Sequence, residues 1–168
     1  GGLYASDLTA AAGYLYFVGY DMTAGYQVFK SNGTASGTKA LTSLNSNANA
    51  KVANLVADGS TLYFSAFDKA HGQQLWSLNT ANNAATMLTG GDIATGGEFP
   101  SGLTPAGNLL YFTARGANSM ASQLWVTDGT AANTTMLTSS IPTAGGVAPM
   151  DMTPSVSSLY FAGSSGAG

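Results

Sequence analysis

The tripeptide Leu-Tyr-Phe occurs four times in this chain at nearly constant intervals, and that repetition limits the folds available to it. The four tyrosines are Tyr16, Tyr63, Tyr111 and Tyr160, so the intervals are 47, 48 and 49 residues. An apolar residue stands eight positions before each tyrosine, and a large aromatic residue follows the first three tyrosines by 13 or 14 positions. A period of this length indicates one small supersecondary unit per repeat.

The further landmarks keep register with the tyrosines. The apolar residues before the tyrosines are Leu8, Leu55, Leu103 and Met152. The aromatic residues after the first three tyrosines are Phe29, Trp76 and Trp125, and each is followed 12 positions later by a leucine: Leu41, Leu88 and Leu137. The extra residues that lengthen the period fall between landmarks, where loops tolerate insertions.

The second repeat shows the local pattern. An apolar run at 54–57 precedes the turn residues at 58–60, and 61–67 is rich in aromatic and β-favouring residues. Residues 73–78 alternate polar and apolar, and 85–89 form a last short run. Short runs of this composition, separated by Gly, Asn and Asp, predict four antiparallel strands joined by turns.

Four strands per unit and no helical periodicity predict an all-β fold. We interpret residues 1–168 as a single repeat domain with repeats near 7–45, 54–90, 102–140 and 151–163, the last one partial. A four-stranded repeat of about 48 residues is typical of β-propeller blades, because stacked sheets bury faces that one sheet leaves exposed. The prediction is three full blades and a half blade, and the alternative is a β-solenoid-like repeat stack.

The last repeat ends after its Leu-Tyr-Phe strand and lacks an aromatic third strand. We therefore expect the chain to be a segment of a larger propeller. An unpaired strand exposes backbone donors and acceptors that another strand can pair with. The expected partners are further repeats of the same chain or neighbouring identical subunits, with glycans as a further possibility.

The segment 123–130, Gln-Leu-Trp-Val-Thr-Asp-Gly-Thr, resembles the ELWxxDGT repeat of bacterial surface proteins. Residues 27–34 form a weaker version, and the second repeat keeps 74–76 but has Asn79-Thr80 in place of Asp-Gly-Thr. The Glu of that family is replaced in all three repeats, by Gln27, Gln74 and Gln123. The resemblance implies propeller-like repeats in large secreted or surface proteins and no defined enzymatic activity.

Composition narrows the function classes. Charged residues make up 8% of the chain, and its five basic residues are scattered, so we expect no nucleic-acid partner. The absence of Cys excludes disulfides and thiolate metal sites. No apolar run approaches the ~20 residues of a membrane-spanning helix. A surface rich in Ser, Thr, Asn, Gln and Gly agrees with an extracellular or cell-surface location.

Few residues suggest a site. His71 is the only histidine, it stands in a predicted turn, and there is no second His and no Cys to help it bind a metal. Asp58-Gly59 and Asp128-Gly129 have the pattern of turn formers rather than of calcium loops. Gly96-Gly97 and Gly145-Gly146 are expected to be loop glycines between repeats. We expect no catalytic or metal-binding residue and no cofactor.

The aromatic residues divide into two groups. Those in fixed register are expected in the core, because such positions recur between stacked sheets. Tyr20, Tyr26 and Phe67 break the register and are the candidates for exposure and ligand binding. The resulting hypothesis is a non-enzymatic structural or adhesive module of a surface layer, sheath, filament or adhesin. The alternative is a carbohydrate-binding propeller module, and an enzyme would need carboxylates converging on the propeller axis.

Overall fold

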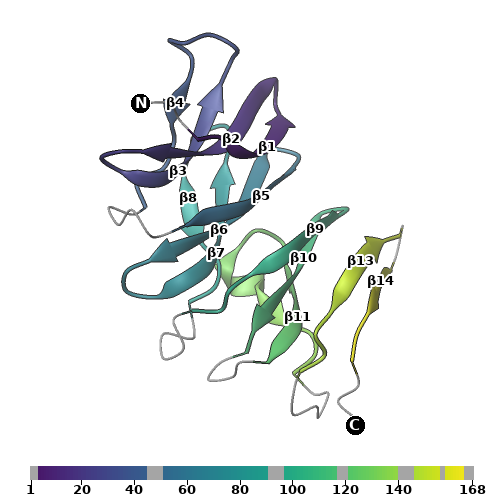
Figure 1. The fold of residues 1–168 in the computed structure, drawn as a ribbon. Coiled ribbons are helices and arrows are strands. Elements are labelled where there is room, and N and C mark those ends of the chain that lie inside the picture. Colours follow the sequence, from purple (N-terminus) through teal and green to yellow (C-terminus); the bar gives the residue numbers. More distant parts are fainter. Residues whose placement is uncertain are drawn as a thin grey trace.

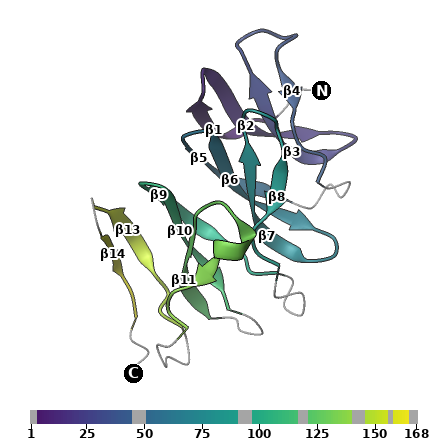
Figure 2. The same ribbon diagram turned by 180° about the vertical axis from the view of Figure 1, so that it is seen from behind.

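The computed structural model describes residues 4–44, 51–90, 97–116, 121–139, 146–155 and 158–164. These residues form three four-stranded antiparallel sheets and one two-stranded hairpin. The sheets follow one another in an arc from the N-terminal sheet to the C-terminal hairpin (Figures 1 and 2). Within the described residues the arc is open, and no closed ring is formed.

The strands follow the expected repeats, although each first strand begins one or two residues before the predicted start of its repeat. The first sheet consists of β1 (Ser6–Ala11), β2 (Tyr14–Asp21), β3 (Gly25–Ser31) and β4 (Lys39–Ala40). The second consists of β5 (Val52–Asp58), β6 (Thr61–Asp68), β7 (Gly72–Asn79) and β8 (Ala85–Met87). The third consists of β9 (Ser101–Ala106), β10 (Leu109–Arg115), β11 (Ser122–Thr127) and β12 (Thr135–Met136), with the short 3-10 helix η1 (Ala131–Asn133) before β12. The hairpin consists of β13 (Met150–Pro154) and β14 (Leu159–Ala162).

Every four-stranded sheet is built from the strands of one repeat in sequence order. This confirms the all-β prediction and the prediction of four antiparallel strands per unit. The sheets of a solenoid, in contrast, run through successive coils. Sheets that are each made of one repeat favour the propeller-type arrangement over that alternative.

The predicted register is confirmed. Tyr16, Tyr63 and Tyr111 lie on the second strands β2, β6 and β10. The residue after each tyrosine is a phenylalanine that pairs with the aromatic residue of the third strand: Phe17 with Phe29, Phe64 with Trp76, and Phe112 with Trp125.

Each first strand contains a bulge at the same position. The antiparallel register shifts there, and the bulged residue has a left-handed φ of 50° at Asp7, 58° at Asn54, 60° at Gly102 and 54° at Asp151. Gly, Asn and Asp are the residues that adopt this conformation most readily. The first strands β1, β5, β9 and β13 contact one another in succession and therefore form the inner side of the arc.

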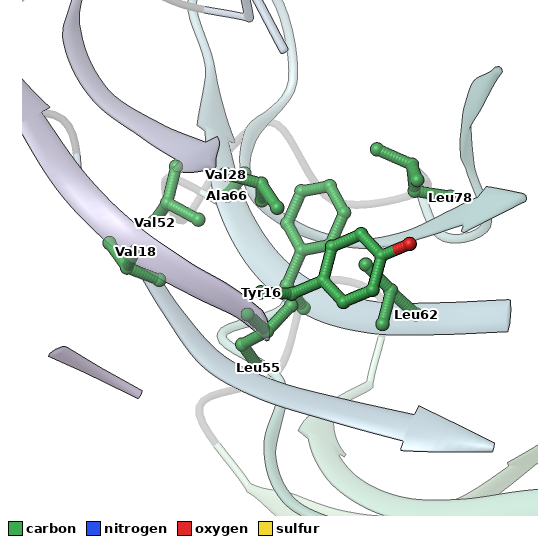
Figure 3. Packing of buried hydrophobic residues seen from close by; sticks show 9 residues of the cluster. Tyr16, Val18, Val28, Val52, Leu55, Leu62, Ala66 and Leu78 are labelled. Carbon is green, nitrogen blue, oxygen red and sulfur yellow. The ribbon is translucent and has the colours of Figure 1, made fainter. Parts of the chain in front are cut away.

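The core lies between successive sheets. Tyr16 of the first sheet has 0% exposure and belongs to a cluster with Leu55, Leu62 and Phe64 of the second sheet (Figure 3). Tyr63 of the second sheet belongs to the equivalent cluster with the third sheet. Burial of one large apolar side chain stabilises a fold by roughly 1.5–3 kcal/mol, so each sheet depends on its neighbours.

One prediction about the core was too strong. Trp76 and Trp125 were expected to be largely buried, but both are only partly buried at the edge of their clusters. Phe64 and Phe112, on the neighbouring second strands, are fully buried instead. Successive sheets contact one another mainly through their first strands and diverge toward their third strands, so a third strand meets less of the neighbouring sheet.

Candidate interaction surfaces

The two ends of the arc present faces that are buried elsewhere in the molecule. We call the face of a sheet toward the preceding sheet its front face and the opposite face its back face. On the front face of the first sheet, Leu8 is 62% exposed and Leu15 is 38% exposed. Their counterparts one repeat later, Leu55 and Leu62, are 6% and 0% exposed because the first sheet covers them.

The back face shows the same contrast at the other end. Tyr160 of the hairpin is 65% exposed, whereas Tyr16 and Tyr63 at the equivalent position are 0% and 3% exposed. Leu137, directly after the fourth strand of the third sheet, is 47% exposed, and its counterpart Leu88 is 4% exposed. Each exposed residue thus has a buried counterpart that a further sheet covers.

The front face of the first sheet is partly closed by its own side chains. The rings of Phe17 and Phe29 stack with centroids 5.4 Å apart and planes 14° apart, and both residues are buried. They lie against Gly19, where an added Cβ would come within 2.8 Å of the Phe29 ring. The second and third sheets have Ala66 and Ala114 at this position. Glycine allows the two rings to cover the strand without a preceding sheet.

Gln27, Gln74 and Gln123, which stand where the ELWxxDGT repeat has Glu, have a structural role. Gln74 is fully buried, its amide donates to the His71 carbonyl at 2.6 Å, and its Oε1 accepts from Thr89 Oγ1 at 2.6 Å. Thr89 Oγ1 in turn accepts the Leu75 N–H at 2.9 Å. An ionised carboxylate could not donate to the carbonyl, so an amide suits this position better than a Glu side chain would.

The same arrangement recurs, and we call it the Gln–Thr latch. Thr42 Oγ1 donates to Gln27 Oε1 at 2.7 Å, and Thr138 Oγ1 donates to Gln123 Oε1 at 2.6 Å. In all three sheets the threonine stands 15 residues after the glutamine and ties the chain beyond the short fourth strand to the third strand. The constant spacing was available in the sequence, and it is the signal that would have revealed the latch.

Asp128 is confirmed as a turn former. Its Oδ1 accepts from the Thr130 N–H at 2.9 Å and from the Thr130 hydroxyl at 2.6 Å, and Asn133 donates to Oδ2 at 2.7 Å. The pKa of Asp128 is lowered because hydrogen bonds stabilise its ionised form. The Thr130 hydroxyl contributes most, followed by Asn133 and the Thr130 amide. Asn32 makes the equivalent bonds to Thr34 in the first sheet.

This turn also covers the preceding sheet. Gly129 lies over the Tyr63 hydroxyl, and Ser77 Oγ donates to the Gly129 carbonyl at 3.3 Å. Burial raises the pKa of Tyr63, and the carboxylates Asp58 and Asp128 add to the effect. The Asp-Gly-Thr motif therefore shapes both its own turn and an inter-sheet contact.

The loop glycines between repeats have a packing role. Gly97 has a φ of 111° and forms a parallel bridge with Gln73, and Gly146 has a φ of 71° and forms one with Ser122. A Cβ on either glycine would overlap the backbone of its partner. Gly96 and Gly145, the other members of the two pairs, lie outside the described residues. The glycines let each connector run against the third strand of the preceding sheet.

His71 is bonded within its own turn. Its Nδ1 lies 2.6 Å from Asp68 Oδ1, and the Ala70 and His71 amides donate to the same oxygen. Partial burial opposes the ionisation of Asp68, but the hydrogen bonds from His71 and Ala70 outweigh it and lower the pKa of Asp68. Within the part of the chain that the structure describes, no three His, Cys, Asp or Glu side chains gather as a metal site would require.

The inner side of the arc carries carboxylate and amide side chains. The bulge positions place Asp7, Asn54 and Asp151 on the inner strands, and all three are exposed. Asn54 donates to Ser65 Oγ at 3.0 Å and to the Pro100 carbonyl at 3.3 Å. The shared backbone conformation gives these residues a structural reason to be there.

The three aromatic residues predicted to be exposed are partly buried. Tyr20 and Tyr26 pair across β2 and β3 with ring centroids 5.0 Å apart, and Tyr26 packs against the first core cluster. Phe67 is also partly buried, near the end of β6. The prediction of exposure was wrong because cross-strand pairing continues to the ends of β2 and β6, so these side chains lie beside neighbours on the adjacent strand.

Phe99 is a more exposed aromatic residue that the sequence did not single out. It is 43% exposed, has a left-handed φ of 52°, and lies 4.2 Å from the Arg115 guanidinium. A cleft of about 280 Å³ beside it is also lined by Lys51, Asn54 and Gln73. Ala148, the counterpart of Phe99, has a similar φ of 43°, so the backbone conformation belongs to the repeat.

Comparisons with known proteins agree with the fold. No family model matches the chain, and no curated protein matches it. A solved structure, the putative TolB from Agrobacterium tumefaciens, is similar with a TM-score of 0.59 and 13% sequence identity. The match covers 98% of this chain and 57% of that protein, so this chain spans little more than half of its length. At this identity the likeness agrees with an all-β fold of propeller-like sheets and shows nothing about activity. The described residues include no helix long and apolar enough to cross a membrane.

Proposed function

We propose that the chain is a non-enzymatic structural module of an extracellular or cell-surface protein, and that its sheets are blades of a larger propeller that stack on sheets of their own kind. One observation carries this proposal. Leu8, Leu15 and Tyr160 are exposed at the ends of the arc, while their counterparts in inner sheets are buried by a neighbour. Each open end face thus matches a sheet of the same repeat type, because a neighbouring sheet covers the same face inside the molecule.

Two further features support it. Charged residues make up only 8% of the chain, so little electrostatic repulsion opposes contact between such faces. The Gln–Thr latch of the three four-stranded sheets bonds within its own sheet, as do the turn side chains of Asn32 and Asp128. The extracellular location rests on the resemblance to ELWxxDGT repeats, and labelling intact source cells with an antibody to this chain tests it.

Sedimentation over a range of concentrations tests the stacking. The chain is expected to associate, and Leu8→Lys and Tyr160→Lys should each weaken association, because a charge on either open face has no partner there. Met22→Lys is the matched control, since Met22 is 85% exposed in the turn between β2 and β3. A monomeric chain at all concentrations, or an equal effect of the control, contradicts the proposal.

A carbohydrate-binding function is the second candidate, and the exposed ring of Phe99 beside the cleft favours it. Aromatic faces stack on sugars, while Lys51, Asn54 and Gln73 offer hydrogen-bonding groups in the same cleft. Saturable binding to one sugar class on a glycan array, lost in Phe99→Ala and kept in Met22→Ala, would favour it. No binding to any sugar on the array would contradict the carbohydrate-binding function.

A further inference from the structure

The hairpin of β13 and β14 has the register of the first two strands of the four-stranded sheets. Met150 pairs with Ala162 and Thr153 with Tyr160, with the register shift that the first hairpin shows between Ser6 and Thr9. Asp151 has the same left-handed conformation as the other bulge residues. In this register β14 corresponds to β2, β6 and β10, and each of those strands pairs with a third strand along its outer edge.

The connector holds this hairpin as it holds a complete sheet. The Ala148 N–H donates to the Ser122 carbonyl at 3.0 Å, which attaches the connector to the third sheet. The Ser164 N–H donates to the Val147 carbonyl at 2.8 Å, and the Arg115 N–H makes the equivalent bond to Glu98 at 2.7 Å. The outer edge of β14 is therefore positioned before any third strand is added.

The side chains that a third strand would cover are exposed. Phe161 is 37% exposed, and its counterparts Phe64 and Phe112 are 0% exposed. Leu137 on the third sheet is 47% exposed, whereas Leu88 is 4% exposed in the cluster that Trp125 packs against. An aromatic residue added opposite Phe161 would lie on the side of the hairpin that faces Leu137.

We propose that the outer edge of β14 binds, by antiparallel strand addition, a strand pair with the pattern of the third and fourth strands of this chain. The pattern is Gln, an apolar residue and an aromatic residue, with Thr 15 positions after the Gln. The aromatic residue pairs with Phe161, and the Gln and Thr form a latch like those of Gln27, Gln74 and Gln123. This inference deepens the proposed stacking function and rests on it.

The strand pair comes from a further repeat of this type. In a copy of this chain, β3, β7 and β11 are already paired within their own sheets. A copy could cover an open face, but it could supply a third strand only by giving up one of its own. Strand addition by a further repeat and face stacking by a copy are therefore separable events.

The test adds a fluorescently labelled peptide with the sequence of residues 121–139 to the full chain, at a concentration where the peptide alone is monomeric. We expect fluorescence anisotropy to saturate at one peptide per chain, and hydrogen exchange at the β14 amides to slow. Phe161→Lys should weaken binding about tenfold or more. Leu8→Lys, at the other end of the arc, should leave it unchanged, and a peptide with Trp125→Ser should bind more weakly.

Three results would overturn the inference: no binding, equal binding to the Phe161→Lys chain, or several peptides per chain. The outcome can be separated from that of the stacking proposal. If self-association is weakened by Leu8→Lys but the chain binds no peptide, the stacking proposal stands and strand addition is contradicted. If the chain binds the peptide but never self-associates, strand addition stands and the stacking proposal is contradicted.

Discussion

The interface between the first two sheets and the open back face of the hairpin carry the same residue in the same register. Tyr16 and Tyr160 both follow a leucine and precede a phenylalanine on the second strand of their repeat. Tyr16 has 0% exposure and Tyr160 has 65%. Tyr16 lies in a four-stranded sheet with the second sheet packed against it, whereas Tyr160 lies in a two-stranded hairpin at the end of the arc. Burial of this tyrosine therefore depends on the strands and the sheet around it and not on the local sequence.

The largest effect is expected from removing a ring at an inner interface. Phe64→Ala should cost about 3–5 kcal/mol in the free energy of unfolding, because Phe64 is fully buried between two sheets. Phe161→Ala, its counterpart on the hairpin, should cost about 1 kcal/mol or less. Urea unfolding of both variants measures the contrast. Equal losses would mean that the hairpin is covered in solution.

A smaller effect is expected at the connectors. Gly97→Ala should cost about 3 kcal/mol, because the methyl group would overlap the Gln73 backbone at a left-handed φ. Gly146→Ala makes the same change beside Ser122 but should release mainly the hairpin. Hydrogen exchange distinguishes them: β13 and β14 should lose protection in Gly146→Ala while β5 and β6 keep it. Loss of protection throughout would show that the hairpin supports the whole arc.

The free-energy cost of altering the Gln–Thr latch should also depend on how deeply the glutamine is buried. Gln74→Glu should cost about 2 kcal/mol, since it removes the donor to the His71 carbonyl and places a carboxylate where no exposure remains. Gln123→Glu should cost about 1 kcal/mol, because Gln123 is partly exposed. Thermal unfolding at neutral pH compares the two variants. A stabilising effect of either change would show that a carboxylate suits this position as well as an amide does.

The smallest effect concerns pH. The pKa of Asp128 is lowered in the folded chain, so its contribution to stability is present above the ordinary carboxyl pKa of about 4 and is lost as pH falls through the folded value. Asp128→Asn should keep the turn, as Asn32 does, and flatten the fall of the urea midpoint below about pH 4. An unchanged slope would mean that other carboxylates account for the acid sensitivity.

Much of the fold could be predicted from the sequence because the pattern is local. Cross-strand neighbours in a hairpin are close in sequence, so turn residues and apolar runs predict the strands of each repeat. The placement of Tyr63 on a second strand and of Trp76 on a third strand followed from that spacing. The Gln–Thr latch was also within reach, since its spacing of 15 residues is the same in all three sheets.

The candidate site was harder to predict, because exposure depends on the neighbouring sheet. Tyr20, Tyr26 and Phe67 were expected to be exposed and are partly buried, while Phe99 was missed and is 43% exposed. The extent of Trp76 burial was also overestimated, since it depends on how the sheets diverge. No pattern within one repeat records that divergence.

The sequence by itself determined the repeat, the strands, their register and the turns, because each depends on residues that lie within one unit of about 48. Only the tertiary structure decided which copies of a repeated residue are buried. Leu62 and Leu15 occupy the same position, yet only Leu62 has a sheet in front of it. Burial requires apolar surface from a second sheet, and that surface comes from residues a full repeat away in the chain.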